Sequence, residues 1–159
     1  MTAAEFFAHV ETLAAGFLAT GLRPGQRVGL LSRTRYEWTL LDYAILAVGG
    51  VTVPIYETSS ADQIRWILSD SGAVAVIVES PKHRALVDGV RDDLDALKRI
   101  WQIEPEAGEP GGVEQLALLG DATTVEEVHA RRRAVRSDDL ATLIYTSGTT
   151  GRPKGCELT

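Results

Sequence analysis

The segment LATLIYTSGTTGRPKG, residues 140–155, holds the strand and the loop that decide how this chain folds. Leu140–Tyr145 is a short apolar run typical of a buried strand. Three glycines follow it within ten residues, together with hydroxyl side chains and one lysine. Glycine permits positive φ and lets backbone N–H groups approach an anion closely, so a loop of this composition suits phosphate. The segment therefore predicts a phosphate-binding loop directly after a strand of an α/β sheet.

The candidate binding residues are the hydroxyl groups, the glycines and the lysine of this loop. Threonine and serine hydroxyls are neutral donors to phosphate oxygens, and lysine adds a compact positive charge on a flexible stem. The residues that we expect to bind phosphates are Thr146, Ser147, Gly148, Thr149, Thr150, Gly151 and Lys154. We assign no catalytic residue and no protein ligand for a metal.

The Walker A loop is the main rival, because it is also rich in glycine and carries a lysine. In that loop the lysine follows a glycine and opens a helix, whereas here Lys154 lies between Pro153 and Gly155. The pattern thus argues against a P-loop NTPase or kinase. A surface turn without a ligand is the other alternative. It is a minor one, since three glycines with this proline and lysine at these offsets arise by chance in roughly one chain in ten thousand.

Upstream of the loop, apolar strands alternate with amphipathic helices. Such alternation favours right-handed crossovers and an α/β fold with a mostly parallel sheet and flanking helices. Ligands of such sheets bind beyond the carboxyl ends of the strands, where the phosphate loop is expected. The expected strands are Arg27–Ser32, Val51–Tyr56, Val74–Glu79, Ile100–Ile103 and Leu140–Tyr145. The expected helices are Thr2–Gly21, Tyr36–Val48, Ser60–Ser69, Pro81–Arg99 and Thr124–Arg133, with a loop over Glu104–Gly112.

Composition indicates one ordinary globular domain of 159 residues. A net charge of −6 argues against general nucleic-acid binding. The one basic run, Arg131–Arg133, is interpreted as a solvated helix face. The single cysteine, Cys156, excludes an intrachain disulfide and suits a reducing cytoplasm. We expect no secretory signal, because the N-terminus carries Glu5 and Glu11 and no basic region. We also expect no transmembrane segment, because the apolar stretch Trp38–Tyr56 is interrupted by Asp42 and two glycines.

Other residues that attract attention are interpreted as structural. The tryptophans lie in or beside apolar runs and are expected to pack in the core. The histidines lack a partner at catalytic spacing and are expected at the surface or in satisfied hydrogen bonds. These residues are Trp38, Trp66, Trp101, His9, His83 and His129.

The pattern YTSGTTGRPKG resembles the phosphate-binding signature of the adenylate-forming superfamily, which includes acyl-CoA synthetases, amino-acid-activating domains of peptide synthetases, and luciferases. Every position of the signature is filled. The resemblance implies that the loop holds the β- and γ-phosphates of ATP while a substrate carboxylate attacks the α-phosphate and pyrophosphate leaves. It also implies Mg²⁺, which binds through phosphates more than through protein cages.

Residues 21–73 resemble long-chain fatty-acyl-CoA synthetases, with Glu37-Trp38, Val53–Thr58 and Ser59–Ala61 in that family's order. Amino-acid-activating domains usually show a Pro-Leu-Asp-Pro type of segment where this chain has Pro54–Glu57. The resemblance implies a fatty-acid:CoA ligase: fatty acid and ATP give acyl-AMP and pyrophosphate, and CoA then displaces AMP. Medium-chain, aryl and amino acids remain open as substrates.

The resemblance covers residues 1–159 as part of the large N-terminal AMP-binding domain, ending just after the loop and without a C-terminal domain. We therefore expect a fragment of the ligase that is inactive in isolation, with residues after the loop prone to fraying and exposed strand edges. A non-enzymatic nucleotide-binding or partner-binding protein is the alternative. A cytoplasmic location, peripheral contact with the inner face of the membrane and a homodimer are compatible with the resemblance.

Overall fold

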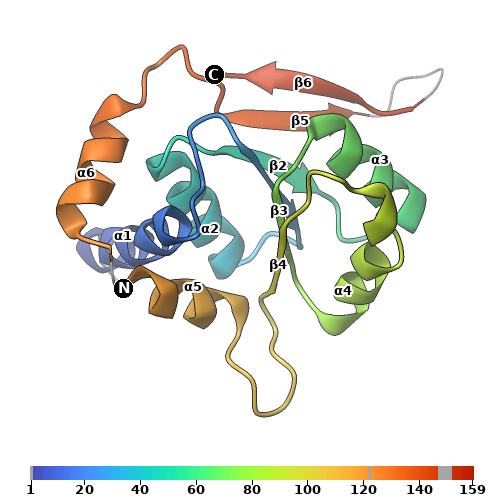
Figure 1. The fold of residues 1–159 in the computed structure, drawn as a ribbon, viewed down its shortest axis with the longest axis horizontal. Helices are drawn as coiled ribbons and strands as arrows, with labels where there is room; N and C mark the ends of the chain where they lie inside the picture. Colours follow the sequence, from blue (N-terminus) through green and yellow to red (C-terminus); the bar gives the residue numbers. More distant parts are fainter. Residues whose placement is uncertain (1, 122, 147–151) are drawn as a thin grey trace.

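A computed structural model describes residues 2–121, 123–146 and 152–159, and within them a twisted β-sheet separates two layers of helices (Figure 1). The described strands lie in the order β4-β3-β1-β2-β5-β6. Their bounds are β1 Arg27–Leu31, β2 Val51–Ile55, β3 Ala75–Val78, β4 Arg99–Gln102, β5 Thr142–Thr146 and β6 Lys154–Leu158.

The sheet is parallel from β4 to β5 and antiparallel at β6. Neighbouring strands pair in parallel from β3–β4 through β1–β3 and β1–β2 to β2–β5. β6 runs back along β5, with Thr146 opposite Lys154 and Thr142 opposite Leu158. The carboxyl ends of β1 to β5 consequently lie at one edge of the sheet. The prediction of a mostly parallel sheet with flanking helices is confirmed.

Helices cover both faces of the sheet. α1, α2, α5 and α6 lie on one face, and α3 and α4 lie on the other (Figure 1). Their bounds are α1 Ala3–Ala19, α2 Tyr36–Ala47, α3 Ala61–Ser71, α4 Pro81–Asp88, α5 Gly112–Gly120 and α6 Val125–Ala134. The parallel strands β1 to β5 are thus joined in turn through helices, as parallel connections require. The connections through α2 and through α5 and α6 cross one face of the sheet, and those through α3 and α4 cross the other.

Capping signals in the sequence set where helices begin. The side chains of Thr2 and Ser60 each accept a hydrogen bond from the backbone N–H three positions later, and the side chains of Glu5 and Gln63 accept one from the backbone N–H of Thr2 and Ser60. These reciprocal bonds satisfy N–H groups that a helix start leaves without an intrahelical partner. α3 ends at Gly72, whose φ of 63° is left-handed. The helices expected from Thr2 and Ser60 are confirmed.

The central strands are buried on both faces, which explains their continuous apolar sequence. Val28 and Leu30 of β1 pack in the cluster beneath α1 and α2, while Leu31 packs in the cluster beneath α3 and α4. All three are 0% exposed. Among the tryptophans, Trp101 is buried and Trp38 and Trp66 are partly buried, so the expectation of packing roles agrees with their position.

The structure departs from the sequence-based predictions in three places. The helix expected over Pro81–Arg99 ends at Asp88, because Gly89 and an aspartate-rich turn follow it and place Leu94 and Leu97 in the core. α5 was not expected; it packs on α1 where Gly16 and Gly120 have no room for a Cβ atom. The residues expected to fray form β6, since pairing with β5 satisfies their backbone.

Candidate phosphate-binding site

The phosphate signature begins at the carboxyl end of β5 and returns through β6. Thr146 is the last residue of β5, Lys154 is the first of β6, and the two are paired across the antiparallel ladder. The position agrees with the general location of ligands in parallel sheets. Five of the expected contact residues, Ser147, Gly148, Thr149, Thr150 and Gly151, lie outside the described residues.

The described part of the signature presents donors and positive charge to solvent. The side chains of Thr146, Arg152 and Lys154 are exposed. The Thr146 hydroxyl lies 3.9 Å from the Cys156 sulfur, a contact in which either atom can donate. Among the described residues, no ion pair joins Lys154 to a carboxylate. A hydroxyl and two cations in this arrangement can attract and hold a polyanion.

Helix α3 anchors both flanks of the signature, a role that the sequence did not indicate. On one flank, the Tyr145 hydroxyl donates to Asp70 Oδ2 at 2.6 Å. On the other, the Trp66 indole Nε1–H donates to the Pro153 carbonyl oxygen at 2.8 Å, and the Arg152 guanidinium carbon lies 4.7 Å from the Trp66 ring centroid. Burial and the bond to the Asp70 carboxylate raise the pKa of Tyr145 above its usual range, which keeps its hydroxyl a donor. The spacing of four residues between Trp66 and Asp70 was the signal available, since it places both on one helix face.

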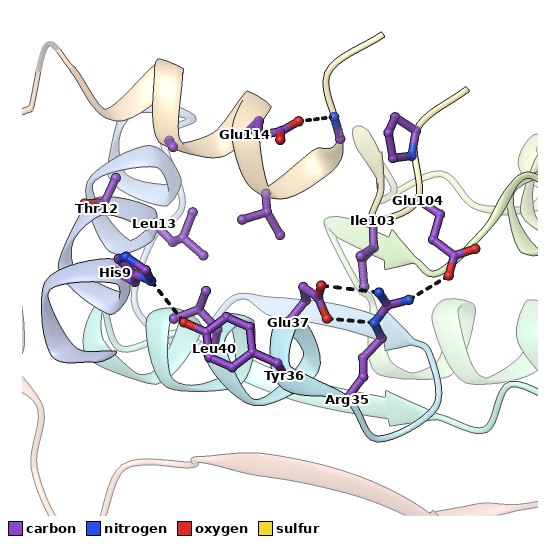
Figure 2. Close-up of a pocket in the computed structure, with 14 residues that line it drawn as sticks. His9, Thr12, Leu13, Arg35, Tyr36, Glu37, Leu40, Ile103, Glu104 and Glu114 are labelled. Carbon is purple, nitrogen blue, oxygen red and sulfur yellow. Dashed lines mark hydrogen bonds and ion pairs between the residues drawn. The ribbon is translucent and has the colours of Figure 1, made fainter. Parts of the chain in front are cut away.

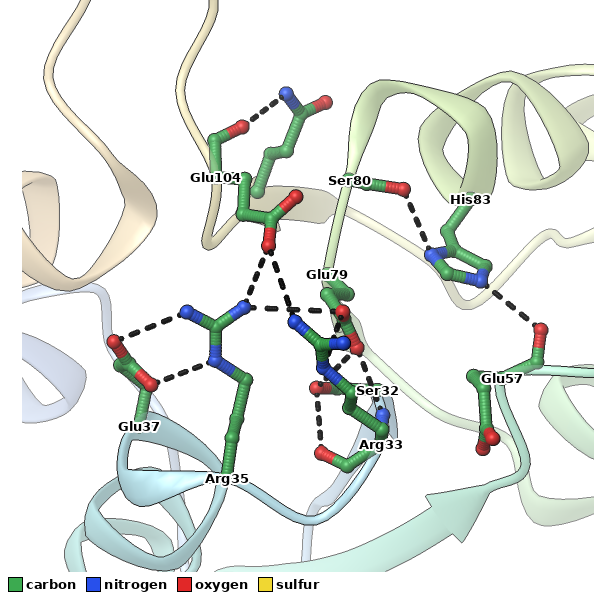
Figure 3. Close-up of polar contacts among 10 residues, drawn as sticks. Ser32, Arg33, Arg35, Glu37, Glu57, Glu79, Ser80, His83 and Glu104 are labelled. Atoms are coloured by element: carbon green, nitrogen blue, oxygen red, sulfur yellow. Dashed lines mark hydrogen bonds and ion pairs between the residues drawn. The ribbon is translucent and has the colours of Figure 1, made fainter.

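A second polar cluster occupies the same edge of the sheet, at the ends of β1, β3 and β4 (Figure 3). Glu79, which follows β3, accepts hydrogen bonds from the Ser32 hydroxyl at 3.0 Å and the Arg33 backbone N–H at 2.9 Å. Its carboxylate also lies 3.0 Å from Arg33 Nε. Arg35 bridges onward to Glu37 and Glu104, at 2.7 Å each. We call these six residues the Glu79 cluster.

The Glu79 cluster is internally compensated. Burial acts to raise the pKa of Glu79, but the Arg33 N–H, the Ser32 hydroxyl and the nearby guanidinium groups outweigh it and hold that pKa below the ordinary value. The hydrogen bond from Arg35 likewise lowers the pKa of Glu37. With its acids matched by arginines, the cluster is suited to fixing strand ends rather than to binding an external anion.

The histidines make satisfied contacts, as expected. His83, which is buried, contacts the Ser80 hydroxyl and the Glu57 carbonyl oxygen, each at 3.0 Å (Figure 3). His9 contacts the Tyr36 hydroxyl at 3.0 Å, and His129 contacts Glu11 at 2.7 Å.

The basic run on α6 is only partly a solvated face. Arg132 and Arg133 pair with Glu11 and Glu126. Arg131 instead donates to the backbone carbonyl oxygens of Leu22, which follows α1, and Val48, which follows α2. These bonds attach α6 to the layer of α1 and α2.

A groove of about 550 Å³ lies on the face of the sheet that α1, α2 and α5 cover (Figure 2). Leu13, Leu40 and Ile103 form its apolar floor, and His9, Arg35 and Glu114 stand at its rim. None of its lining residues belongs to the phosphate signature. The sequence did not predict this groove, because it assembles from segments about one hundred residues apart. No lysine lines it, and its one arginine, Arg35, is paired with Glu37 and Glu104.

The described residues lack two features that bear on metals and membranes. No group of three or more His, Cys, Asp or Glu residues among them could hold a metal ion. No helix among them is long and apolar enough to span a bilayer.

Comparison with known proteins identifies the family. The family model described as "AMP-binding enzyme" matches residues 1–159. The chain belongs to this family.

The relatives of this family member are acid:CoA ligases. The long-chain-fatty-acid–CoA ligase FadD15 of Mycobacterium bovis is 48% identical over 159 residues, which are 100% of this chain and 26% of that ligase. A solved long-chain-fatty-acid-CoA ligase, FadD1 from Archaeoglobus fulgidus, is 25% identical with a TM-score of 0.80 over 100% of this chain and 30% of that one. The solved N-terminal domain of FACL13 from Mycobacterium tuberculosis is 30% identical, with a TM-score of 0.78 over 99% and 37% of the two chains. The chain thus spans about a quarter of the length of the curated relatives it matches.

Proposed function

We propose that this chain is the ATP phosphate-binding part of a long-chain fatty-acid:CoA ligase. Residues 1–159 would contribute the portion of the N-terminal AMP-binding domain that carries the signature loop. Thr146, Ser147, Gly148, Thr149, Thr150, Gly151 and Lys154 would hold the β- and γ-phosphates of ATP. One observation carries the proposal: a complete adenylate-forming signature follows a parallel strand at the carboxyl edge of the sheet, in a chain that is 48% identical to a long-chain-fatty-acid–CoA ligase.

The proposed chemistry places negative charge where the loop supplies donors. When a carboxylate attacks the α-phosphate, the leaving pyrophosphate gains charge. Lys154 and the hydroxyl of Thr146 would stabilise that charge, because donors fixed in advance pay no reorganisation cost in the transition state. Removing one such donor from an active site typically costs about 2.7–4 kcal/mol of transition-state stabilisation.

The remaining substrates and the metal follow from the family. Hydroxyl and ammonium groups suit phosphate oxygens rather than a bare divalent cation, so we propose that Mg²⁺ arrives with the nucleotide and is held mainly through its phosphates. Mg²⁺ would neutralise part of the polyphosphate charge. The fatty acid and CoA complete the proposed set of ligands. We further propose that the 159 residues bind ATP phosphates without completing the ligation, since they span 26% of the relative's length.

The exposed, free thiol of Cys156 supports a proposed cytoplasmic location, where thiols stay reduced. Peripheral contact with the inner face of the membrane and homodimer formation are separate hypotheses. Flotation with lipid vesicles tests the first, and sedimentation velocity tests the second.

Calorimetric titration of the chain with Mg·ATP tests the phosphate assignment. We expect Lys154→Ala to weaken binding about tenfold or more, because a hydrogen bond to a charged group contributes about 1.5–3 kcal/mol. Lys98→Ala is the matched control, since Lys98 is also exposed and lies in the loop before β4, away from the signature. Equal affinities for wild type and both variants would contradict the proposal.

A further inference from the structure

We propose that Trp66 is a positioning residue that holds Lys154 in place through Arg152 and Pro153. The inference rests on the proposed function, because it concerns how the phosphate-binding lysine is presented. Three contacts suggest it: the indole N–H to the Pro153 carbonyl at 2.8 Å, the Arg152 guanidinium over the indole ring, and the Asp70–Tyr145 bond one turn further along α3.

Lys154 needs a positioning residue because β6 is exposed. Every residue of β6 is exposed, so burial of apolar surface does little to hold this strand in place. Its described attachment consists of the ladder to β5 and the contacts of the residues just before it. A lysine that carries a phosphate-binding charge must nevertheless be held near one geometry, since ordering it upon binding would cost affinity.

Helix α3 is a rigid base for that purpose. It begins with a reciprocal cap at Ser60 and Gln63, and its Ile64 and Leu68 are at most 1% exposed. Trp66 and Asp70 lie one turn apart on α3, and they contact Pro153, just before β6, and Tyr145 of β5. The same helix therefore fixes the flank that enters the signature, through Tyr145, and the flank that leaves it, through Pro153.

The indole ring meets all the requirements at once. Its body packs partly buried against the cluster beneath α3 and α4. Its N–H donates to the carbonyl oxygen of Pro153, which directly precedes Lys154. Its face contacts the guanidinium group of Arg152. Phenylalanine would keep an aromatic ring at this position, although a smaller one with a weaker cation–π face, and would lose the donor. Trp66→Phe is therefore the substitution that isolates the hydrogen bond.

Hydrogen exchange of the β6 amides, measured by NMR on the whole chain, tests the positioning. We expect Trp66→Phe to lower the protection of the Lys154 to Cys156 amides about fivefold, the effect of one net hydrogen bond, with β1 and β3 amides unchanged. Trp38→Phe is the matched control, because Trp38 is also partly buried on a helix but lies in the opposite layer. Arg152→Ala, which alters an exposed residue and leaves the α3 packing intact, is a second variant and should lower protection about twofold.

Titration with inorganic tripolyphosphate, used as the probe, completes the test. The inference predicts about fivefold weaker binding by Trp66→Phe than by Trp38→Phe. Unchanged hydrogen-exchange protection of the β6 amides in both Trp66→Phe and Arg152→Ala would overturn the inference. Reduced protection of these amides together with an unaltered affinity for tripolyphosphate would also overturn it. Absence of any tripolyphosphate binding by the wild type would overturn the proposed function instead, and the exchange data alone would then decide whether Trp66 holds Lys154.

Discussion

The carboxyl edge of the sheet carries two polar regions that differ in how their charges are matched. The Glu79 cluster at the ends of β1, β3 and β4 pairs each acid with arginines and backbone donors. The signature at the end of β5 presents exposed cations and a hydroxyl, without a carboxylate paired to Lys154 among the described residues. The edge of a parallel sheet can thus have its charges compensated within the protein at some strands and available to a ligand at others.

Burial explains why the two regions divide in this way. The Glu79 side chain is 9% exposed, so its charge must be compensated within the protein. Lys154 is exposed, and no carboxylate in the described part of the chain pairs with it, which leaves its charge available to a polyphosphate. The first region is thus expected to affect stability and the second to affect binding.

The largest expected effect on stability belongs to Glu79. Glu79→Ala should lower the free energy of unfolding by about 3 kcal/mol, because it leaves the Arg33 N–H, the Ser32 hydroxyl and two guanidinium groups without their shared acceptor. Urea denaturation at neutral pH measures this loss. Glu104→Ala is the control, since the Glu104 side chain is 43% exposed and should cost less than about 1 kcal/mol. Equal losses of unfolding free energy in the two variants would show that the buried Glu79 carboxylate contributes no more to stability than the exposed Glu104 carboxylate.

A smaller loss is expected where the signature is anchored. Tyr145→Phe removes the hydroxyl that donates to Asp70 and should cost about 1 kcal/mol of unfolding free energy, the usual net value of one hydrogen bond. Tyr43→Phe is the control, because Tyr43 is 47% exposed and should change stability by less than about 0.5 kcal/mol. If both variants unfold at the same urea concentration, the anchor contributes nothing to the fold.

The smallest expected effect is on the pH dependence of stability. The folded protein holds the pKa of Glu79 below its ordinary value, so the carboxylate stabilises the fold above the unfolded pKa of about 4.3. That contribution is lost as pH falls through the lower, folded pKa. Wild type should therefore lose stability more steeply below about pH 4.3 than Glu79→Gln. Parallel curves for the two proteins, measured by urea denaturation at each pH, would contradict the role given to Glu79.

The sequence predicted elements whose signals are local. The capping residues Thr2 and Ser60 located two helix starts, and the apolar run before Tyr145 located β5. The complete signature identified the family. Contacts between distant residues left no such local pattern: the bond from Trp66 to Pro153 joins positions 87 apart, so Trp66 was expected only to pack.

The errors share a physical cause, which is that tertiary packing outweighed local propensity. Leu94 and Leu97 entered the core instead of continuing α4, and Gly120 allowed α5 to approach α1 closely. β6 has no alternating pattern of burial, and it forms because β5 offers a free edge. The Glu79 cluster was missed because a glutamate after a strand gives no sign of the arginines that the topology brings to it.

Chemical-shift mapping of the ¹⁵N-labelled chain during titration with tripolyphosphate tests most directly whether the carboxyl edge is divided in this way. We expect saturable shifts at the amides of Thr146, Arg152 and Lys154, with a smaller response of the Trp66 indole N–H and none at Ser32, Arg33 or Arg35. Shifts centred on Arg33 and Arg35, with the β5 and β6 resonances unmoved, would contradict it and would place the anion site in the Glu79 cluster.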